Sequence, residues 1–303
     1  MNDNDSRTAP GRLSVAVLGA GLIGIDLMTK IIRSDHLDLR LVAGRDETTS
    51  GLRRAAALGV PVASGGAQSL VDSGHRFDVV FDATSASAHA EHVATLSPLG
   101  TTLIDLTPSS AGQMIIPTVN RADISAHSDL SMVSCGGQAS VPVLHAIAEA
   151  HQIDYIEVVT TCATLSIGHG TRVNLDEYVE TTQKAVRAFT GVDDVKVMLN
   201  ISPARPPATF RVAMSLLGND LTAESVRSLV TAAAAEVRSY AKGFEVKACG
   251  VDDGKAFVSV EVTSVGDRIP RYAGNLDIIN SAAILVAESY AADRLSMAGV
   301  GNS

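Results

Sequence analysis

A glycine-spaced turn between an apolar run and an amphipathic segment constrains the fold of this chain most. Residues 13–19, LSVAVLG, have the pattern of a strand, and residues 23–34 have helical periodicity. Gly19 would permit the tight turn, Gly21 a close approach of the backbone to a pyrophosphate, and Gly24 close packing of helix on strand. The whole turn comprises Gly19, Ala20, Gly21, Leu22, Ile23 and Gly24. In this context the G-x-G-x-x-G spacing predicts a nucleotide-binding turn, with the phosphate at the helix N-terminus.

Strand-like and helix-like segments alternate through the first half of the chain. Such alternation favours a parallel sheet, because each crossover passes over one face of the sheet. We therefore expect residues 13–134 to form a Rossmann NAD(P)-binding domain, an α/β doubly wound parallel sheet. The expected strands are residues 13–19, 37–44, 77–84 and 101–107, and the expected helices include residues 23–34 and 50–58.

The second half of the chain has a different pattern. Its strand candidates are longer and are grouped with long helices, which predicts a second α+β domain with an antiparallel or mixed sheet over residues 135–274. The strand candidates include residues 153–166, 195–202 and 208–217, and the helix candidates are residues 138–150, 171–190 and 221–241. Residues 1–12 are polar and lack an apolar signal-peptide core, so we expect a disordered tail.

Charge and cysteine content restrict the class of protein. The net charge of -9 and the pI near 5.3 argue against nucleic acid and give no attraction to an anionic membrane. No apolar run reaches the roughly 18 residues of a membrane span. The three cysteines have no C-x-x-C spacing, which disfavours disulfides and predicts a reducing cytoplasm. His89 and His145 have the pattern of helix residues, no cluster has metal-ligand spacing, and we expect no metal.

Two neighbouring residues bear on the choice of nucleotide. Asp46 stands 22 residues after Gly24, close to the spacing of a ribose-binding acid, which favours NAD. Arg45 precedes it and could bind a 2′-phosphate, so NADP stays possible. We assign Thr84 and Ser85, at the end of the strand over residues 77–84, to the same cofactor site.

The segment S-C-G-G-Q, residues 134–138, places a cysteine and two glycines at the expected boundary between the two domains. A thiol at a helix N-terminus has a lowered pKa, so Cys135 is the expected nucleophile. Gly136 and Gly137 would leave space for a substrate and supply amide donors to an oxyanion. The alternative is a buried structural cysteine, and Cys162 and Cys249 are better interpreted in that way.

Seven stretches carry a resemblance to a known family. They are GAGLIGIDLMTK (19–30), FDATSASAHAE (81–91), IDLTP (104–108), IPTVN (116–120), SCGGQAS (134–140), GTRVNLDEY (170–178) and YAGNLDI (272–278). The chain resembles the acylating acetaldehyde dehydrogenases of aromatic meta-cleavage pathways, from about residue 14 to about residue 292.

The resemblance implies a fold and a reaction. It implies a Rossmann NAD domain, a substrate and dimerisation domain, and a last helix, residues 275–303, that returns to the first domain. Cys135 would attack an aldehyde, hydride would pass to NAD, and coenzyme A would release an acyl-CoA, or the reaction would run in reverse. Asn275 matches the family's asparagine beside the nicotinamide; the alternative is an N-cap of the last helix. The resemblance also implies a homodimer and a possible 4-hydroxy-2-oxovalerate aldolase partner.

Departures from the family pattern gather near the expected site. Leu22 replaces an asparagine, Ser87 an aromatic residue and Val212 the aspartate thought to serve in proton transfer. Leu165 and Ile167 are bulkier than usual, and His169 replaces a proline. We assign Gln138 and Ile167 to the substrate site.

His169 is the expected replacement for the missing aspartate, as a group that titrates near neutrality; the alternative is an exposed loop histidine. The departures predict a substrate other than acetaldehyde, or loss of the aldolase partner. Two other functions stay open: a phosphorylating semialdehyde dehydrogenase, and a nucleotide-binding partner subunit without activity.

Overall fold

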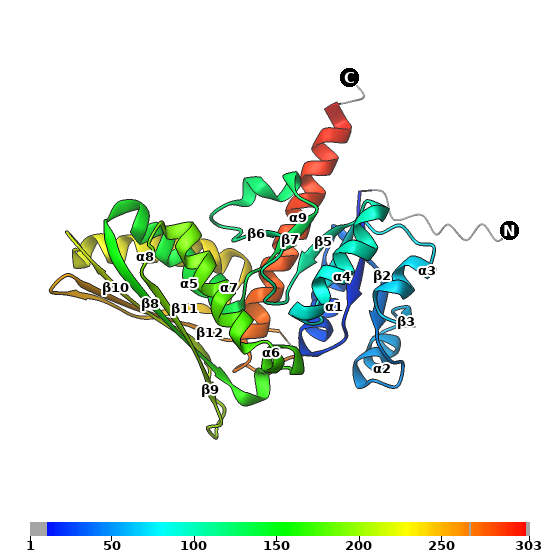
Figure 1. The fold of residues 1–303 in the computed structure, drawn as a ribbon, viewed down its shortest axis with the longest axis horizontal. Coiled ribbons are helices and arrows are strands. Elements are labelled where there is room, and N and C mark those ends of the chain that lie inside the picture. Colours follow the sequence, from blue (N-terminus) through cyan, green and yellow to red (C-terminus); the bar gives the residue numbers. More distant parts are fainter. Residues whose placement is uncertain (1–10, 267, 301–303) are drawn as a thin grey trace.

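The computed structural model describes residues 11–266 and 268–300, with the side chains of residues 169, 170 and 295–300 left aside. Two sheets organise this part of the chain, one built from residues 13–131 and one from residues 153–262 (Figure 1). The helix that ends the described chain lies between them.

The first sheet is parallel throughout, in the order β3-β2-β1-β4-β5-β7-β6. The chain starts at the centre and winds outward to both edges, so the expected doubly wound Rossmann fold is confirmed. Its strands are β1 (Leu13–Leu18), β2 (Leu37–Gly44), β3 (Val62–Ser64), β4 (Val79–Asp82), β5 (Thr102–Asp105), β6 (Gln113–Met114) and β7 (Asp129–Ser131).

Both faces of this sheet are buried, which explains why β1 is apolar at every position but one. Val15 and Val17 join one apolar cluster, whereas Ala16 and Leu18 join a second cluster on the opposite face. The helices of this part of the chain are α1 (Leu22–Arg33), α2 (Ser50–Ala57), α3 (Ala67–Asp72) and α4 (Ala86–Leu96), with short 3₁₀ turns at Ser97–Leu99 and Arg121–Ala126.

The second sheet is mixed, in the order β11-β12-β10-β8-β9, with only β8 and β9 parallel. The expected α+β domain with an antiparallel or mixed sheet is confirmed. Its strands are β8 (Ile153–Ala163), β9 (Val195–Ser202), β10 (Phe210–Gly218), β11 (Phe244–Asp252) and β12 (Lys255–Val262).

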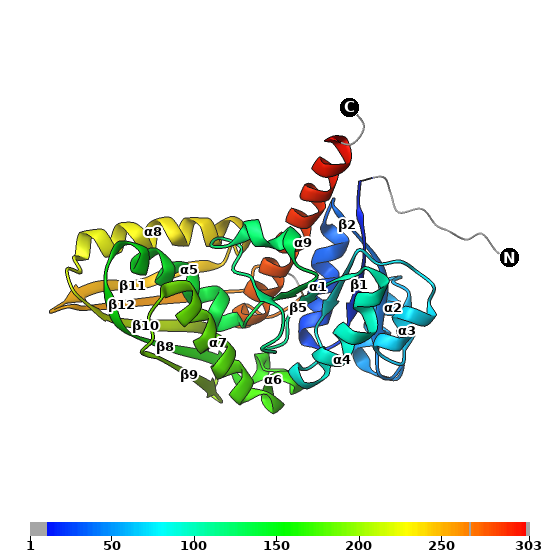
Figure 2. The same cartoon turned by 45° about the horizontal axis from the view of Figure 1, so that its top comes forward.

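Helices cover one face of the second sheet and leave the other open (Figure 2). Inward residues of β10 such as Val212 and Met214 are fully buried, while Leu217 of β10 and Phe257 of β12 are 37% and 45% exposed. The helices after the first domain are α5 (Cys135–Ala150), α6 (His169–Val173), α7 (Leu175–Thr190), α8 (Ala223–Tyr240) and α9 (Gly274–Val300), with a 3₁₀ turn at Thr164–Ser166. An uncovered sheet face with large apolar side chains is a surface that a partner can cover.

Helix α9 connects the two parts of the molecule. It contacts α5 and β12 of the second domain and lies along α1 of the first. Asn280 donates to the Ile23 carbonyl at 3.1 Å and to the Asp26 carboxylate at 2.8 Å, and Lys30 Nζ lies 2.6 Å from Asp277 Oδ1. These buried polar contacts hold α9 against the helix that follows the glycine turn.

The described residues cover the two ends of the chain only in part. Residues 1–10 of the expected tail and residues 301–303 of the expected last segment are outside the described residues. The expectation that the tail reaches residue 12 is wrong, because Arg12 donates to the backbone carbonyls of Ser34 and Leu37. None of the helices in the described ranges combines the length and the apolar character that crossing a bilayer requires.

Candidate active site

The glycine turn has three distinct local geometries. Gly19 has a φ of +102°, and a Cβ there would lie 2.6 Å from the Ala83 carbonyl oxygen. A Cβ at Gly24 would lie 2.0 Å from the Gly19 carbonyl oxygen, so α1 packs tightly on the turn. A Cβ at Gly21 would meet nothing within 4 Å. Protein atoms therefore leave no room for a side chain at Gly19 and Gly24, whereas the space next to Gly21 is open.

Four residues expected to contact the cofactor lie in loops at the same carboxyl edge of the sheet as the glycine turn: Arg45, Asp46, Thr84 and Ser85. Asp46 is exposed just beyond β2 and accepts the Thr48 amide at 2.7 Å, a hydrogen bond that lowers the pKa of its carboxyl group. Arg45 is exposed beside it. Thr84 donates its hydroxyl to Asp82 at 2.6 Å, and Ser85 precedes the first turn of α4. All four follow strands of the parallel sheet at their carboxyl ends, where such folds bind ligands.

Asn275 lies within the first turn of α9 and is 5% exposed. Its Nδ2 donates to the Ser166 carbonyl at 3.0 Å, whereas its Oδ1 is buried without a hydrogen-bond partner. The helix begins at Gly274, so the N-cap alternative for Asn275 is wrong. An unpaired buried amide oxygen is costly unless a ligand donates to it. This orphan acceptor and the open space at Gly21 fit a bound dinucleotide.

Cys135 is the first residue of α5 and contacts the apolar clusters of both domains. The preceding residues make an abrupt turn from β7: Val133 has a φ of 62°, which is strained for a β-branched residue. Ser134 caps the helix by accepting the Gly137 amide at 2.9 Å. The thiol is half-buried at a helix N-terminus, as expected for a reactive cysteine.

Two groups from other elements contact the Cys135 sulfur. The hydroxyl of Tyr178, on α7, lies 3.6 Å from Sγ, and Cys162, at the end of β8, forms a hydrogen bond with it. The Cys162 contact is the largest cause that lowers the pKa of Cys135; Tyr178 adds to it, and burial acts in the opposite direction. The same contact, together with burial, raises the pKa of Cys162 well above its ordinary value. Cys162 is fully buried, whereas Cys135 lies at a helix N-terminus, so the negative charge is favoured on Cys135.

The two glycines after Cys135 do not play the expected part. The Gly136 amide donates to the Tyr178 hydroxyl at 3.0 Å, and the Gly137 amide donates to the cap residue Ser134. A Cβ at Gly136 would lie 2.4 Å from the Tyr178 hydroxyl, so protein atoms fill the space expected for a substrate. The predicted free space and free oxyanion donors at Gly136 and Gly137 are therefore wrong.

Gln138 is also part of the protein interior. It is fully buried, and its Nε2 donates to the backbone carbonyls of Ile115 at 2.8 Å and Met132 at 3.0 Å. Its Oε1 is buried without a hydrogen-bond partner, and the assignment of Gln138 to the substrate site stays a prediction.

The family departures divide into buried and exposed positions. Val212 is fully buried and pairs across the sheet with Thr160, whose hydroxyl lies beside Gly136. Ile167 is 6% exposed in the same apolar cluster as Cys162, while Leu165 is 65% exposed. The side chain of His169 lies outside the described part of the structure.

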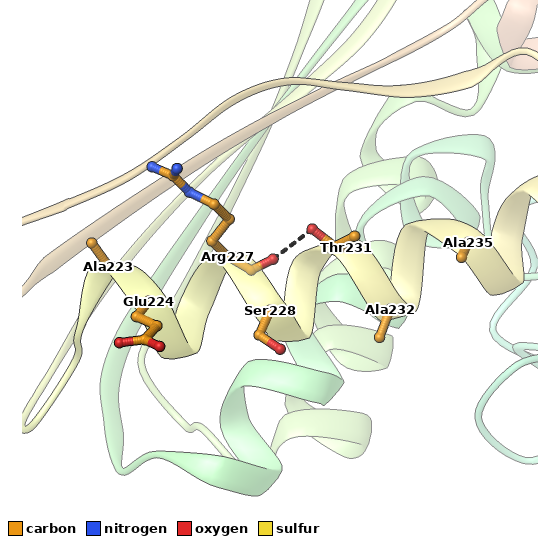
Figure 3. Close-up of a pocket in the computed structure, with 7 residues that line it drawn as sticks. All are labelled: Ala223, Glu224, Arg227, Ser228, Thr231, Ala232 and Ala235. Atoms are coloured by element: carbon orange, nitrogen blue, oxygen red, sulfur yellow. Dashed lines mark hydrogen bonds between the residues drawn. The ribbon is translucent and has the colours of Figure 1, made fainter.

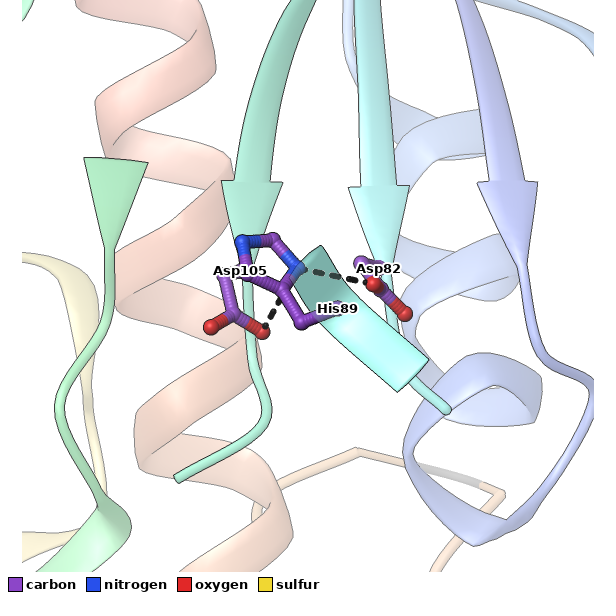
Figure 4. A group of neighbouring side chains, drawn as sticks. All are labelled: Asp82, His89 and Asp105. Atoms are coloured by element: carbon purple, nitrogen blue, oxygen red, sulfur yellow. Dashed lines mark hydrogen bonds and ion pairs between the residues drawn. The ribbon is translucent and has the colours of Figure 1, made fainter. Parts of the chain in front are cut away.

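A buried charged cluster that the sequence spacing did not indicate lies under the carboxyl edge of the first sheet (Figure 4). His89 of α4 lies 2.9 Å from Asp82 of β4, 3.7 Å from Asp105 of β5 and 3.0 Å from Asp129. Burial opposes the charge on His89, but hydrogen bonds with Asp129 and Asp82 outweigh it and raise its pKa to about 10. Burial raises the pKa of Asp105 to about 7.

The charged cluster holds three groups that could ligate a metal, Asp82, His89 and Asp105, within 4.8 Å of one another. They already hydrogen-bond or pair with one another and with the loop after β5, where Asp105 accepts the Thr107 amide at 2.7 Å. The expected absence of a metal stays a prediction.

The surface of α8 carries a hollow of about 710 Å³ (Figure 3). It is shallow and lined by side chains of this one helix, among them Glu224, Arg227 and Thr231. It contains none of the residues expected to bind cofactor or substrate, so the reactive cysteine and not this hollow defines the candidate site.

Comparison with known proteins places the chain in a family. A family model described as prokaryotic acetaldehyde dehydrogenase, dimerisation, matches residues 135–270. Acetaldehyde dehydrogenase of Streptomyces griseus is 51% identical over 291 residues, which cover 95% of this chain and 94% of the relative. The enzyme of Pectobacterium atrosepticum is 40% identical, covering 91% and 95%.

A solved structure confirms the class of fold. Aspartate semialdehyde dehydrogenase II of Vibrio cholerae, in complex with ASA, superposes with a TM-score of 0.66 at 15% identity, covering 93% of this chain and 99% of the other. The two chains therefore share a two-domain fold with a Rossmann-like first domain. The chain belongs to the acetaldehyde dehydrogenase family and is an oxidoreductase of that type.

Proposed function

We propose that this protein is a CoA-acylating aldehyde dehydrogenase that converts an aldehyde, coenzyme A and NAD(P)+ to an acyl-CoA and NAD(P)H. The observation that carries the proposal is the position of Cys135: a half-buried thiol at a helix N-terminus, between the two domains, with a lowered pKa. The family relationship supports the reaction type. The reverse reaction, from an acyl-CoA, uses the same site.

The nucleotide belongs at the carboxyl edge of the first sheet. Gly19, Gly21 and Gly24 would admit the pyrophosphate, with Ala20, Leu22 and Ile23 between them, and Thr84 and Ser85 would line the neighbouring loop. Asp46 favours NAD and Arg45 keeps NADP possible. The unpaired Oδ1 of Asn275 would accept a hydrogen bond from the carboxamide of the nicotinamide. When bound, the nicotinamide supplies the hydride acceptor.

The chain's own residues account for the covalent steps. The Cys135 thiolate attacks the carbonyl carbon of the aldehyde, and a bond forms between sulfur and carbon while the oxygen takes the negative charge. After loss of hydride the acyl group is held on Cys135 as a thioester. The thiolate of coenzyme A then attacks this thioester, the Cys135–acyl bond breaks, and the thiolate of Cys135 is restored.

The open face of the second sheet supports a homodimer. Leu217 and Phe257 lie there with Arg211 and Glu261, which pair at 2.7 Å, so the face is both apolar and charged. Such a mixed surface fits a second copy of the chain. A cytoplasmic location and an aldolase partner remain predictions from the sequence and the resemblance.

Cys135→Ser tests the nucleophile. We expect CoA-dependent NADH production to fall at least about a thousandfold, while NADH binding, measured by the fluorescence of the reduced nicotinamide, stays unchanged. Cys249→Ser is the matched control, because Cys249 is half-buried on β11, away from the site. Retained turnover in Cys135→Ser would contradict the assignment. Replacing CoA by phosphate in the same assay separates the semialdehyde dehydrogenase alternative.

Gly21→Ala tests the nucleotide site. A Cβ there meets no protein atom, so we expect the free energy of unfolding to change by less than about 0.5 kcal/mol. The affinity for NAD should fall about tenfold, because the methyl group occupies the approach of the pyrophosphate. Gly250→Ala on β11, also in open space, should leave both quantities unchanged. An unchanged affinity in Gly21→Ala would place the nucleotide elsewhere.

A further inference from the structure

We propose that Tyr178 is a catalytic residue of this reaction, and that its hydroxyl donates a hydrogen bond to the Cys135 sulfur whenever that sulfur carries negative charge. The proposal rests on the proposed function, because it concerns the same nucleophile. It assigns a role to a residue that neither the glycine turn nor the cysteine motif indicates.

The direction of the hydrogen bond follows from the neighbouring groups. Tyr178 Oη accepts the Gly136 amide at 3.0 Å, and the Cys135 sulfur lies 3.6 Å away. With one lone pair occupied by the amide, the hydroxyl proton remains to be donated. A thiolate has no proton and can only accept. Once Cys135 ionises, Tyr178 must therefore be the donor.

Local structure fixes the hydroxyl in place. Tyr178 is 3% exposed in the first turn of α7, where its amide bonds the Asn174 carbonyl at 3.1 Å. Thr182 donates to the Tyr178 carbonyl at 2.6 Å and lies 2.7 Å from the hydroxyl of Ser134. The cap of the cysteine helix and the first turn of α7 are thus connected through side chains.

The S-C-G-G motif acquires a different explanation. Any side chain at Gly136 would collide with the Tyr178 hydroxyl, since a Cβ would lie 2.4 Å from Oη. The glycine therefore makes room for a tyrosine that contacts the sulfur. The glycine after Cys135, which predicted space for a substrate, instead provides space for the Tyr178 hydroxyl, a hydrogen-bond donor.

Electrostatics make Tyr178 a donor and not a base. Burial first, and then the charge of Cys135, raise the pKa of Tyr178 well above its ordinary value, so the hydroxyl stays protonated. Cys162 and Thr160 also act on the pKa of the Tyr178 hydroxyl, and Val212, opposite Thr160, has no proton to give. Tyr178 supplies a dipole, and no proton leaves it.

This hydrogen bond acts at two points of the reaction. It favours the thiolate before attack, and it weakens as the sulfur–carbon bond forms and the charge moves to the aldehyde oxygen. When CoA displaces the acyl group, the sulfur–carbon bond breaks and the charge returns to sulfur, where the donor stabilises the leaving group. All atoms and charges balance without any proton transfer through Tyr178.

Tyr178→Phe is the test, with the pH dependence of Cys135 alkylation by iodoacetamide as the readout. Peptide mass spectrometry separates Cys135 from the other cysteines. We expect the midpoint of the profile to move to higher pH and the rate at pH 7 to fall about tenfold. The plateau rate at high pH should not fall, because a more basic thiolate is at least as nucleophilic. A general structural disturbance would lower the plateau without moving the midpoint.

Tyr240→Phe is the matched control, because the Tyr240 hydroxyl is buried without a partner and is not among the groups that shift the pKa of Cys135. It should leave the profile unchanged. Should Tyr178→Phe fold poorly, 3-fluorotyrosine at position 178 keeps the shape and strengthens the donor, and the midpoint should move to lower pH. An unmoved midpoint in either variant would overturn the role of Tyr178. Failure of the proposed function would appear separately, as turnover retained in Cys135→Ser.

Discussion

Two buried groups of titratable side chains lie in this molecule, and they differ in how charge is compensated. In the charged cluster, His89 lies between carboxylates, and the pKa of Asp82 is lowered to about 2: burial opposes this, but hydrogen bonds with His89 and His92 outweigh it. Around Cys135, by contrast, the neighbours are the neutral donors Cys162 and Tyr178. The charged cluster pairs opposite charges, whereas the donors around Cys135 face a sulfur that becomes negative only when the thiol ionises.

The difference separates a structural cluster from a reactive one. A buried charge that is paired with an opposite charge is stabilised by that partner, and removing the partner costs stability, which is typical of a structural role. A partly buried cysteine at a helix N-terminus, with hydrogen-bond donors beside its sulfur, can ionise. Strongly shifted pKa values occur in both groups, so a shift alone does not identify the nucleophile.

The largest expected effect comes from breaking the charged cluster. His89→Ala leaves Asp105 without its histidine partner and leaves Asp82 with His92, 2.7 Å away, as its remaining one, so we expect a loss of about 3–5 kcal/mol in the free energy of unfolding. Chemical denaturation measures it. His151→Ala is the control: its ring bonds the Ser225 hydroxyl at 2.8 Å, and its loss should cost about 1 kcal/mol. Equal losses would mean that the cluster is not ionic.

The second prediction uses pH. The pKa of His89 rises from 6.5 to about 10 on folding, so its stabilisation is complete below pH 6.5 and is lost as the pH rises toward 10. The pKa of Asp105, raised to about 7, acts in the same direction between pH 3.8 and pH 7. Asp82 acts oppositely, losing stabilisation as the pH falls from 3.8 toward 2.

We therefore expect the free energy of unfolding to decline by a few kcal/mol, on the order of 2–4, between pH 7 and pH 10. His89→Gln should remove this part of the decline, because the remaining titrating groups are common to both proteins. Urea denaturation at successive pH values measures the difference between the two proteins. A difference that stays constant with pH would show that His89 does not hold its proton.

The comparison also explains what the sequence could predict. The Rossmann sheet and its glycine turn follow from local patterns, because strand, turn and helix are adjacent in the chain. Cys135 could be singled out as well, since a helix N-terminus is a local feature. The contacts that tune it come from Cys162 and Tyr178, which lie 27 and 43 residues further along the chain.

The errors have the same origin. The amides of Gly136 and Gly137 were expected to be free because glycines at a helix N-terminus expose their N–H groups, but Tyr178 and Ser134 accept these amides in the fold. The sequence did not predict the charged cluster because its members come from three strands and a helix. Contacts between elements depend on packing, which spacing along the chain does not encode.

The smallest expected effect concerns the second donor to Cys135. Cys162→Ala removes the S–H hydrogen bond, so the pKa of Cys135 should rise toward its ordinary value. The Cys162 contact stands first among the causes that lower the pKa of Cys135, but a thiol is a weaker donor than a hydroxyl, so we expect the alkylation rate of Cys135 at pH 7 to fall about threefold, less than in Tyr178→Phe. Cys249→Ala, on β11, should leave the rate unchanged. If Cys162→Ala instead raised the rate at pH 7, Cys162 would be a competitor for the negative charge, and the sulfur site would resemble the charged cluster more than it differs from it.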